Sequence, residues 1–276
     1  MQSARDRLHA IRPARRRAGL APLMTAAPLI WAAVHSPGPF VVALHEHARA
    51  ALLITLLFAF LAYRIRGVDY SGALAGAVLS FLLFVSGGPG AFVVVLAVFV
   101  LTVASTRFGY TRKRQLGVAE RKQGRNGWQI LANLAVAAAF CVGALYGPHE
   151  PLLLAGVAAL AEAAADTVSG ECGKALSDQV FLITTFKRVT VGTDGGISLA
   201  GTVAGVIAAL IVALVSGWTH LVSSHRIAVV GGAAVLASFV DSLLGATLQR
   251  RGFLNNEAVN LVSTAAASGI ALVLLR

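Results

Sequence analysis

Long apolar stretches recur along this chain, and short polar or glycine-containing segments separate them. With their flanks included, nine of these stretches approach the roughly 20 residues that a membrane-crossing helix needs. The Pro-Gly-Pro run at 37–39 and the Gly-Gly-Pro-Gly run at 87–90 mark turns between them. The nine expected helices cover approximately residues 20–34, 48–63, 71–85, 91–106, 128–146, 151–165, 195–218, 227–248 and 258–275.

Composition supports a membrane protein. Of the 276 residues, 57% are hydrophobic and only 13% are charged, against about 25% charged in a soluble domain. The apolar stretches are continuous, whereas the strands of a membrane barrel would alternate. The sequence therefore predicts an all-α, polytopic, multi-pass membrane protein, in the inner membrane if the cell is bacterial. We expect a basic cytoplasmic segment at 1–18 and one membrane-embedded helical domain at 19–276.

The net charge of +11 sets topology and does not indicate a nucleic-acid partner. Twenty of the 23 lysines and arginines fall in loops that nine helices would place on one side of the membrane. Positive loops stay inside, so the N-terminus is expected inside and the C-terminus outside. The first apolar stretch also has the length of a signal-peptide core, and we expect it to be a retained anchor.

A polar stripe is expected at the start of the fifth helix. Arg125, Gln129 and Asn133 recur every four residues, so a helix would place them on one face, descending from the inside surface. They could contribute to a polar pocket. The alternative is an arginine that reaches the interface and two amides that hold helices together.

Carboxylates gather at the inside end of the sixth helix. Glu162 and Asp166 lie one turn apart, and Glu171 and Lys174 follow. Mg²⁺ prefers a few carboxylates together with phosphate oxygens and water, so two or three of these carboxylates could hold Mg²⁺. The alternative is a set of carboxylates paired with nearby lysines and arginines.

The next loop combines two cations with a glycine turn that precedes a helix. Glycines let backbone N–H groups approach a phosphate, and a helix N-terminus favours negative charge. The alternative is an ordinary basic loop with a glycine turn. The expected phosphate-binding residues are Lys174, before this loop, and Lys187, Arg188, Gly192, Thr193, Gly195 and Gly196 within it.

Polar residues also occur in the last two expected helices. Asp241 lies nine residues before Arg250, roughly 13 Å into the membrane, where a carboxylate needs a cation, a metal or a proton. Asn256 and Asn260 share one helix face with Thr264. Hydrogen bonding between helices is the alternative. By the predicted topology, all of these clusters lie at the inside ends of helices five to nine, which favours one common site.

These motifs resemble an integral membrane family long classed as a domain of unknown function, number ninety-two. That family includes transmembrane protein nineteen of animals and the phytyl-phosphate kinase of the vitamin E pathway. The resemblance covers roughly residues 70–275 and rests on five motifs in order. They read GRNGWQILAN at 124–133, ADTVSGECGK at 165–174, KRVTVGTDGGISLAGT at 187–202, DSLLGATLQ at 241–249 and NEAVNLVST at 256–264.

The family is similar, more distantly, to CTP-using membrane enzymes such as phytol kinase, dolichol kinase and CDP-lipid synthases. This resemblance implies that Asp166 and Glu171 lie beside the metal and that the loop from Lys187 to Gly196 holds the nucleotide phosphates. Asp241 and Asn260 would complete the pocket. Val168, Gly170 and Leu134 depart from the residues expected at their positions, which leaves the charged positions intact.

Together with these polar clusters, the resemblance predicts a lipid-phosphate kinase. A cytosolic nucleoside triphosphate, expected to be CTP, would donate a phosphoryl group to a prenyl (phytyl) monophosphate, with Mg²⁺ offsetting the developing charge. The expected catalytic residues are Asp166, Lys187, Asp241 and Arg125. Two alternatives stay open: a nucleotidyltransferase that forms a CDP-lipid in the same pocket, and a membrane transporter. The polar residues stop midway across the membrane, which argues against transport.

Overall fold

The computed structural model describes residues 38–276. The predicted basic segment at 1–18 and the first predicted helix at 20–34 lie outside these residues. The described helices are α2 (Pro39–Arg64), α3 (Tyr70–Arg107), α4 (Tyr110–Gln115), α5 (Gly127–Gly143), α6 (His149–Leu176), α7 (Leu199–Trp218), the short η1 (Ser224–Arg226), α8 (Ile227–Leu244), the π-helical η2 (Gly245–Gln249) and α9 (Asn256–Leu274).

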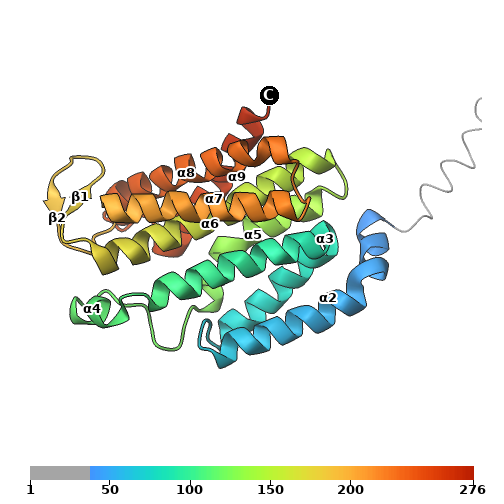
Figure 1. Cartoon of the computed structure of the whole chain (residues 1–276), viewed down its shortest axis with the longest axis horizontal. Coiled ribbons are helices and arrows are strands. Elements are labelled where there is room, and N and C mark those ends of the chain that lie inside the picture. The colour runs from blue at the N-terminus through green and yellow to red at the C-terminus, as the bar shows by residue number, and fades with distance from the viewer. Residues whose placement is uncertain (1–37) are drawn as a thin grey trace, which may run out of the picture. The chain divides into compact units, whose positions relative to one another are not determined.

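Helix α6 lies at the centre of residues 39–276. Helices α3, α5, α7, α8 and α9 all contact it, and it is the most completely buried of the long apolar helices. Helix α2 packs against α3 on the outside of this bundle (Figure 1). Because α6 is largely buried, a polar side chain on it needs a partner on a neighbouring helix or access to a cavity.

Six helices between residues 38 and 276 are long and apolar enough to cross a membrane, and α5 is a shorter apolar helix. This confirms the helical membrane protein that composition predicts. It does not establish the predicted count of nine crossings or their orientation, which stay predictions.

The predicted third and fourth helices are the two halves of α3. The chain leaves helical geometry at Gly88, where φ is +71°, and Pro89 follows. A straight helix of 38 residues would be roughly 57 Å long, yet the guanidinium of Arg107 at its end donates to the carbonyl oxygen of Ile65, just before its start. The halves therefore fold back on each other, as Figure 1 shows.

Helix α6 extends well past the predicted end at residue 165 and stops at Leu176. The prediction followed hydropathy, which falls after Ala165, whereas the backbone needs only residues that tolerate helical geometry. Asp166, Glu171 and Lys174 are therefore helical.

Helix α7 starts later than predicted, at Leu199. Ser198 caps it by accepting a hydrogen bond from the backbone N–H of Gly201 at 3.2 Å.

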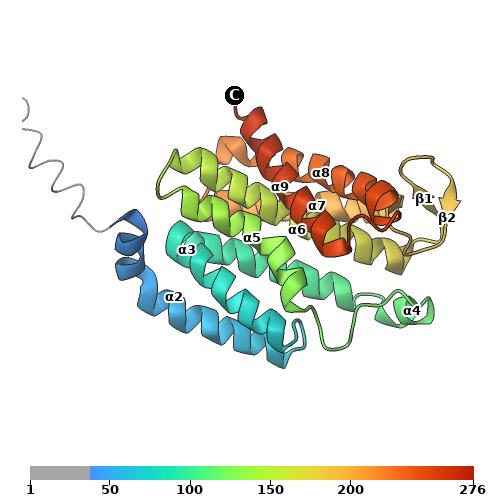
Figure 2. The ribbon, with the colours of Figure 1, turned by 180° about the vertical axis from the view of Figure 1, so that it is seen from behind.

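A small antiparallel sheet corrects the all-α prediction. Strands β1 (Val180–Leu182), β2 (Arg188–Val189) and β3 (Gly196–Ile197) pair in the order β2-β1-β3. Phe181 lies opposite Arg188 on one side and Ile197 on the other. Figure 2 shows β1 and β2 beyond the helix ends, at the same end of the bundle as α4. We call this end the polar end.

Glycines bring α6 and α7 close together. A Cβ at Gly201 would lie 2.7 Å from the carbonyl oxygen of Ser169, and one at Gly205 would lie 2.9 Å from that of Ala165. Small residues permit such backbone approach between membrane helices. The close packing holds the C-terminal half of α6, with its carboxylates, firmly in the bundle.

Candidate functional site

A polar cavity of ≈ 410 Å³ opens at the polar end between α5, α6, α8 and α9. We call it the acidic cavity. Among the residues predicted to form a site, twelve line it: Arg125, Gln129, Asp166, Glu171, Lys174, Gly192, Thr193, Gly195, Gly196, Asp241, Asn256 and Asn260. Four do not: Asn133, Glu162, Lys187 and Arg188.

Asp166 of α6 and Asp241 of α8 face each other in this cavity. Their carboxyl groups lie close enough to interact, and Asp241 also accepts a hydrogen bond from the Ser263 hydroxyl at 3.2 Å. The positive charges of Arg125 and Lys174 act on Asp166. Two adjacent carboxylates cannot both stay ionised without a cation or a proton between them, so this pair is suited to binding a cation.

Glu162 lies one turn deeper along α6 and is 1% exposed. Its Oε1 atom has no hydrogen-bond partner within the described part of the chain, although the charges of Asp166 and Asp241 act on it. It therefore lies behind the carboxylate pair and outside the cavity wall.

Arg125 is positioned by backbone contacts with the turn between α2 and α3. Its carbonyl oxygen accepts from the Asp69 N–H at 2.9 Å, and its own N–H donates to the Gly67 carbonyl oxygen at 3.2 Å. A side chain at Gly72 would collide with the Arg125 carbonyl oxygen, so this approach requires glycine. Arg125 thus reaches the cavity from a segment that is hydrogen-bonded to the α2–α3 turn.

The polar stripe on α5 has several roles. The side chains and backbones of Asn126 and Gln129 form a reciprocal cap, with hydrogen bonds of 2.9 and 3.0 Å, and Gln129 also lines the cavity. Asn133 accepts a hydrogen bond from the Asn260 amide at 3.2 Å. The packing alternative therefore describes Asn133, which joins α5 to α9 beneath the cavity.

Glu171 is held by two lysines. Its Oε2 accepts from Lys113 Nζ at 2.5 Å and its Oε1 from Lys174 Nζ at 3.0 Å. Lys113 is fully buried, and sequence reasoning missed it because it is one of several cations in a loop that appeared to serve only topology. With both oxygens engaged, Glu171 fits a metal less well than Asp241 does.

The glycine turn docks on the end of α8. A side chain at Gly195, where φ is +71°, would collide with the backbone of Ala246. One at Gly245 would lie 2.8 Å from the Gly195 nitrogen. This close approach brings Gly192, Thr193 and Gly196 to the cavity wall.

The two cations before this turn are placed differently from the prediction. Lys187 and Arg188 are exposed, and Arg188 donates to the carbonyl oxygen of Asp178 at 3.1 Å. Strand pairing between β1 and β2 carries both residues away from the cavity wall. Sequence spacing could not reveal this, because the paired strands are only two or three residues long.

The residues present suit Mg²⁺ on one condition. No group of three or more histidine, cysteine or carboxylate side chains that could hold a metal occurs in residues 38–276. Mg²⁺ is commonly bound by one or two carboxylates, with phosphate oxygens and water completing its shell. Asp166 and Asp241 supply two carboxylates, so the fit requires a phosphate-bearing substrate.

Comparison with known protein families identifies the family of this chain. The family described as integral membrane protein DUF92 matches residues 53–268. The chain belongs to this family. The matched region contains every predicted site residue, so the acidic cavity lies wholly within the DUF92 part of the chain.

Relatives in the DUF92 family come from distant organisms. An uncharacterized membrane protein of Synechocystis is 37% identical over 201 residues, which is 71% of this chain and 78% of the relative. Protein VTE6, chloroplastic, of Arabidopsis thaliana is 33% identical over 221 residues, 76% of this chain and 66% of that protein. An uncharacterized membrane protein of Methanocaldococcus jannaschii is 32% identical over 215 residues, 78% of this chain and 88% of the relative. No solved structure matches the chain.

Proposed function

We propose that this protein is a membrane-embedded kinase that transfers a phosphoryl group from CTP to a prenyl (phytyl) monophosphate at the polar end. The observation that carries the proposal is the pair Asp166 and Asp241, which adjoin in a cavity that also holds Arg125 and Lys174. The DUF92 family, to which the chain belongs and whose members include a phytyl-phosphate kinase, supports it.

The chemistry needs positioning and charge neutralisation more than covalent help. Arg125 and Lys174 would donate to phosphate oxygens, and backbone N–H groups of the glycine turn would add neutral donors. Mg²⁺ bound at Asp166 and Asp241 would offset the negative charge of the triphosphate. Asp166 on α6 and Asp241 on α8 would be the residues that hold this cation.

The acceptor needs no strong base. An oxygen of the lipid monophosphate, already ionised near neutral pH, forms a bond to the terminal phosphorus of CTP. The bond from that phosphorus to its bridging oxygen breaks, and its electron pair leaves with CDP. The products are a lipid diphosphate and CDP.

Transfer from γ-labelled CTP to phytyl, geranylgeranyl and farnesyl monophosphate tests this proposal with the purified protein in lipid nanodiscs and Mg²⁺. We expect label in the lipid diphosphate, and a loss of about 100-fold or more in Asp166→Asn and Asp241→Asn. Asp178→Asn is the matched control, because Asp178 is exposed and bonded to Arg112 outside the cavity wall; it should keep full activity.

Two results would contradict the proposed kinase function. Pyrophosphate release with a CDP-lipid product would show a nucleotidyltransferase in the same cavity. Absence of both products, in protein that is folded and binds nucleotide, would remove the enzymatic proposal.

A further inference from the structure

A second cavity, strongly basic, lies beside the acidic one at the polar end. It measures ≈ 380 Å³ and is bounded by the α2–α3 turn, the end of α3 and the segment before α5. Five cations and a single carboxylate line it. The cations are Arg66, Arg107, Arg121, Lys122 and Arg125, and the carboxylate is Glu120.

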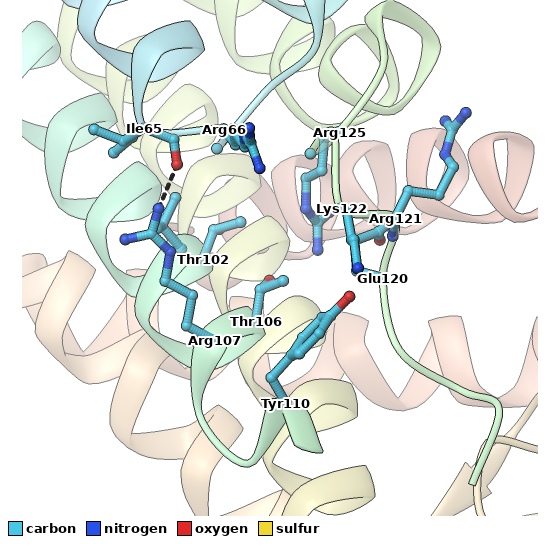
Figure 3. Close-up of a pocket in the computed structure, with 13 residues that line it drawn as sticks. Ile65, Arg66, Thr102, Thr106, Arg107, Tyr110, Glu120, Arg121, Lys122 and Arg125 are labelled. Atoms are coloured by element: carbon cyan, nitrogen blue, oxygen red, sulfur yellow. Dashed lines mark hydrogen bonds between the residues drawn. The ribbon is translucent and has the colours of Figure 1, made fainter. Parts of the chain in front are cut away.

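Two residues in the wall of this cavity carry a buried donor that lacks a partner. Thr106 Oγ1 and Arg125 Nε have no hydrogen-bond partner among residues 38–276, although both atoms are buried. Figure 3 shows the Tyr110 hydroxyl and the Arg125 side chain directed into the same space, with Arg107 on the opposite wall, bonded to Ile65. Unpaired buried polar atoms are costly, and an anionic group bound here would satisfy them.

An apolar groove begins at the floor of the basic cavity. It runs between α2, both halves of α3 and α5, and it shares Gly67, Thr102 and Arg125 with the basic cavity. Its walls are mainly aliphatic and aromatic, and its volume is only ≈ 60 Å³. Phe58 and Phe99, which contact each other edge to face with ring centroids 5.0 Å apart, form part of it. A single narrow slot suits one hydrocarbon chain better than a lipid with two.

Arg125 connects all three spaces. It lines the basic cavity, the apolar groove and the acidic cavity. An anion on one side and a triphosphate on the other would therefore both come within reach of one guanidinium, whose five donors can serve two phosphates at once.

We infer that the basic cavity and the apolar groove together form the acceptor site for a single-chain lipid monophosphate. The phosphate occupies the basic cavity, the hydrocarbon chain lies in the groove, and Arg125 is the point where acceptor and donor phosphates meet. This inference rests on the proposed kinase function for the identity of the ligand. The location of the site rests on the structure alone, because the basic cavity is continuous with the apolar groove.

Glycine 76 offers a selective test of the groove. A Cβ at Gly76 would have Ile130 Cγ2, at 4.0 Å, as its nearest neighbour, so the backbone tolerates a side chain while the rest of a leucine fills the slot. Gly269→Leu is the matched control, because Gly269 also lies in an apolar helix and its Cβ would meet no atom within 4 Å.

Binding of geranylgeranyl monophosphate, isopentenyl monophosphate and CTP is measured separately on each protein in nanodiscs. Gly76→Leu is expected to lower the affinity for geranylgeranyl monophosphate by about tenfold or more. It should leave the affinities for isopentenyl monophosphate and CTP unchanged. Gly269→Leu should change none of the three. Unaltered geranylgeranyl monophosphate affinity in Gly76→Leu would overturn the inference.

Crosslinking of the unmutated protein gives an answer that does not depend on a variant folding. Geranylgeranyl monophosphate with a photoreactive diazirine at the far end of its chain should label peptides within 58–76 or 95–99. Labelling confined to other helices would overturn the inference. Labelling of the groove without phosphoryl transfer would uphold the acceptor site and reject the kinase, so the two proposals fail separately.

Discussion

Lys113 is a buried cation at the edge of the acidic cavity. Its ammonium group donates to the carbonyl oxygens of Ser105 at 3.0 Å and Thr106 at 2.7 Å, and to Glu171 at 2.5 Å. The side chain is 0% exposed and Glu171 is 4% exposed as a residue. All three ammonium donors are therefore used, so this buried lysine leaves no donor unsatisfied.

Replacing Lys113 with methionine should destabilise the protein strongly. Glu171 would keep only the partly exposed Lys174, and breaking a buried pair typically costs about 3–5 kcal/mol. We expect a clearly lower Tm in detergent for Lys113→Met, whereas Arg114→Met, at an exposed cation of the same helix, should leave the Tm almost unchanged. Adding Glu171→Gln to Lys113→Met should recover part of the loss. Equal Tm values for the two single variants would show that the pair contributes little.

The glycine turn and the end of α8 form one structural unit. Gly195 has positive φ and no space for a side chain against Ala246, whereas Gly252 has a positive φ of +77° and would meet nothing within 4 Å. Comparing substitutions at these two glycines therefore distinguishes the effect of backbone strain from that of close packing. This distinction matters because the turn lines the acidic cavity only while it stays docked.

Gly195→Ala should impair transfer far more than Gly252→Ala does. Both changes impose left-handed strain of about 1–2 kcal/mol, but only the first pushes the turn off α8. We expect at least a tenfold lower kcat/KM and faster proteolysis within 183–193 for Gly195→Ala, with near-normal values for Gly252→Ala. Equal losses in both variants would mean that strain, and not docking, decides the effect.

Within residues 38–276, the ionisable groups that line the acidic and basic cavities lie at one end of the bundle. The acidic cavity, the basic cavity and the exposed cations of the β1–β2 hairpin all belong to the polar end, and the positive-inside rule predicts that this end faces the cytosol. A cytosolic nucleotide would then reach the acidic cavity directly, and a lipid could enter the groove sideways from the bilayer.

Labelling of single cysteines tests this orientation. The two cysteines of the chain are first removed by Cys141→Ala and Cys172→Ala. Single cysteines are then introduced at Lys187, before the start of α7, and at Ser224, after its end; both positions are exposed. A membrane-impermeant maleimide added to intact cells should label Ser224→Cys and leave Lys187→Cys unlabelled until the cells are opened. The reverse pattern would invert the predicted topology.

The local sequence pattern by itself determines the membrane class, the turn at 87–90 and the expectation of a common polar site. The membrane class follows from composition, because lipid admits few charges and demands internally satisfied backbones. The turn at 87–90 follows from Gly88 and Pro89, which cannot continue a helix in the geometry found there. Polar groups within a membrane are costly and therefore gather. On this basis the sequence predicts one common polar site, and most of the predicted residues line one cavity.

Only the tertiary structure decided which polar groups meet. Asp166 and Asp241 come from helices far apart in sequence, and Glu171 binds Lys113 across 58 positions. Strand pairing turned Lys187 and Arg188 away from the cavity, and the α2–α3 turn placed Arg125 between three spaces. The physical reason is that a sequence shows that a buried charge needs a partner, whereas the partner is chosen by how the helices pack.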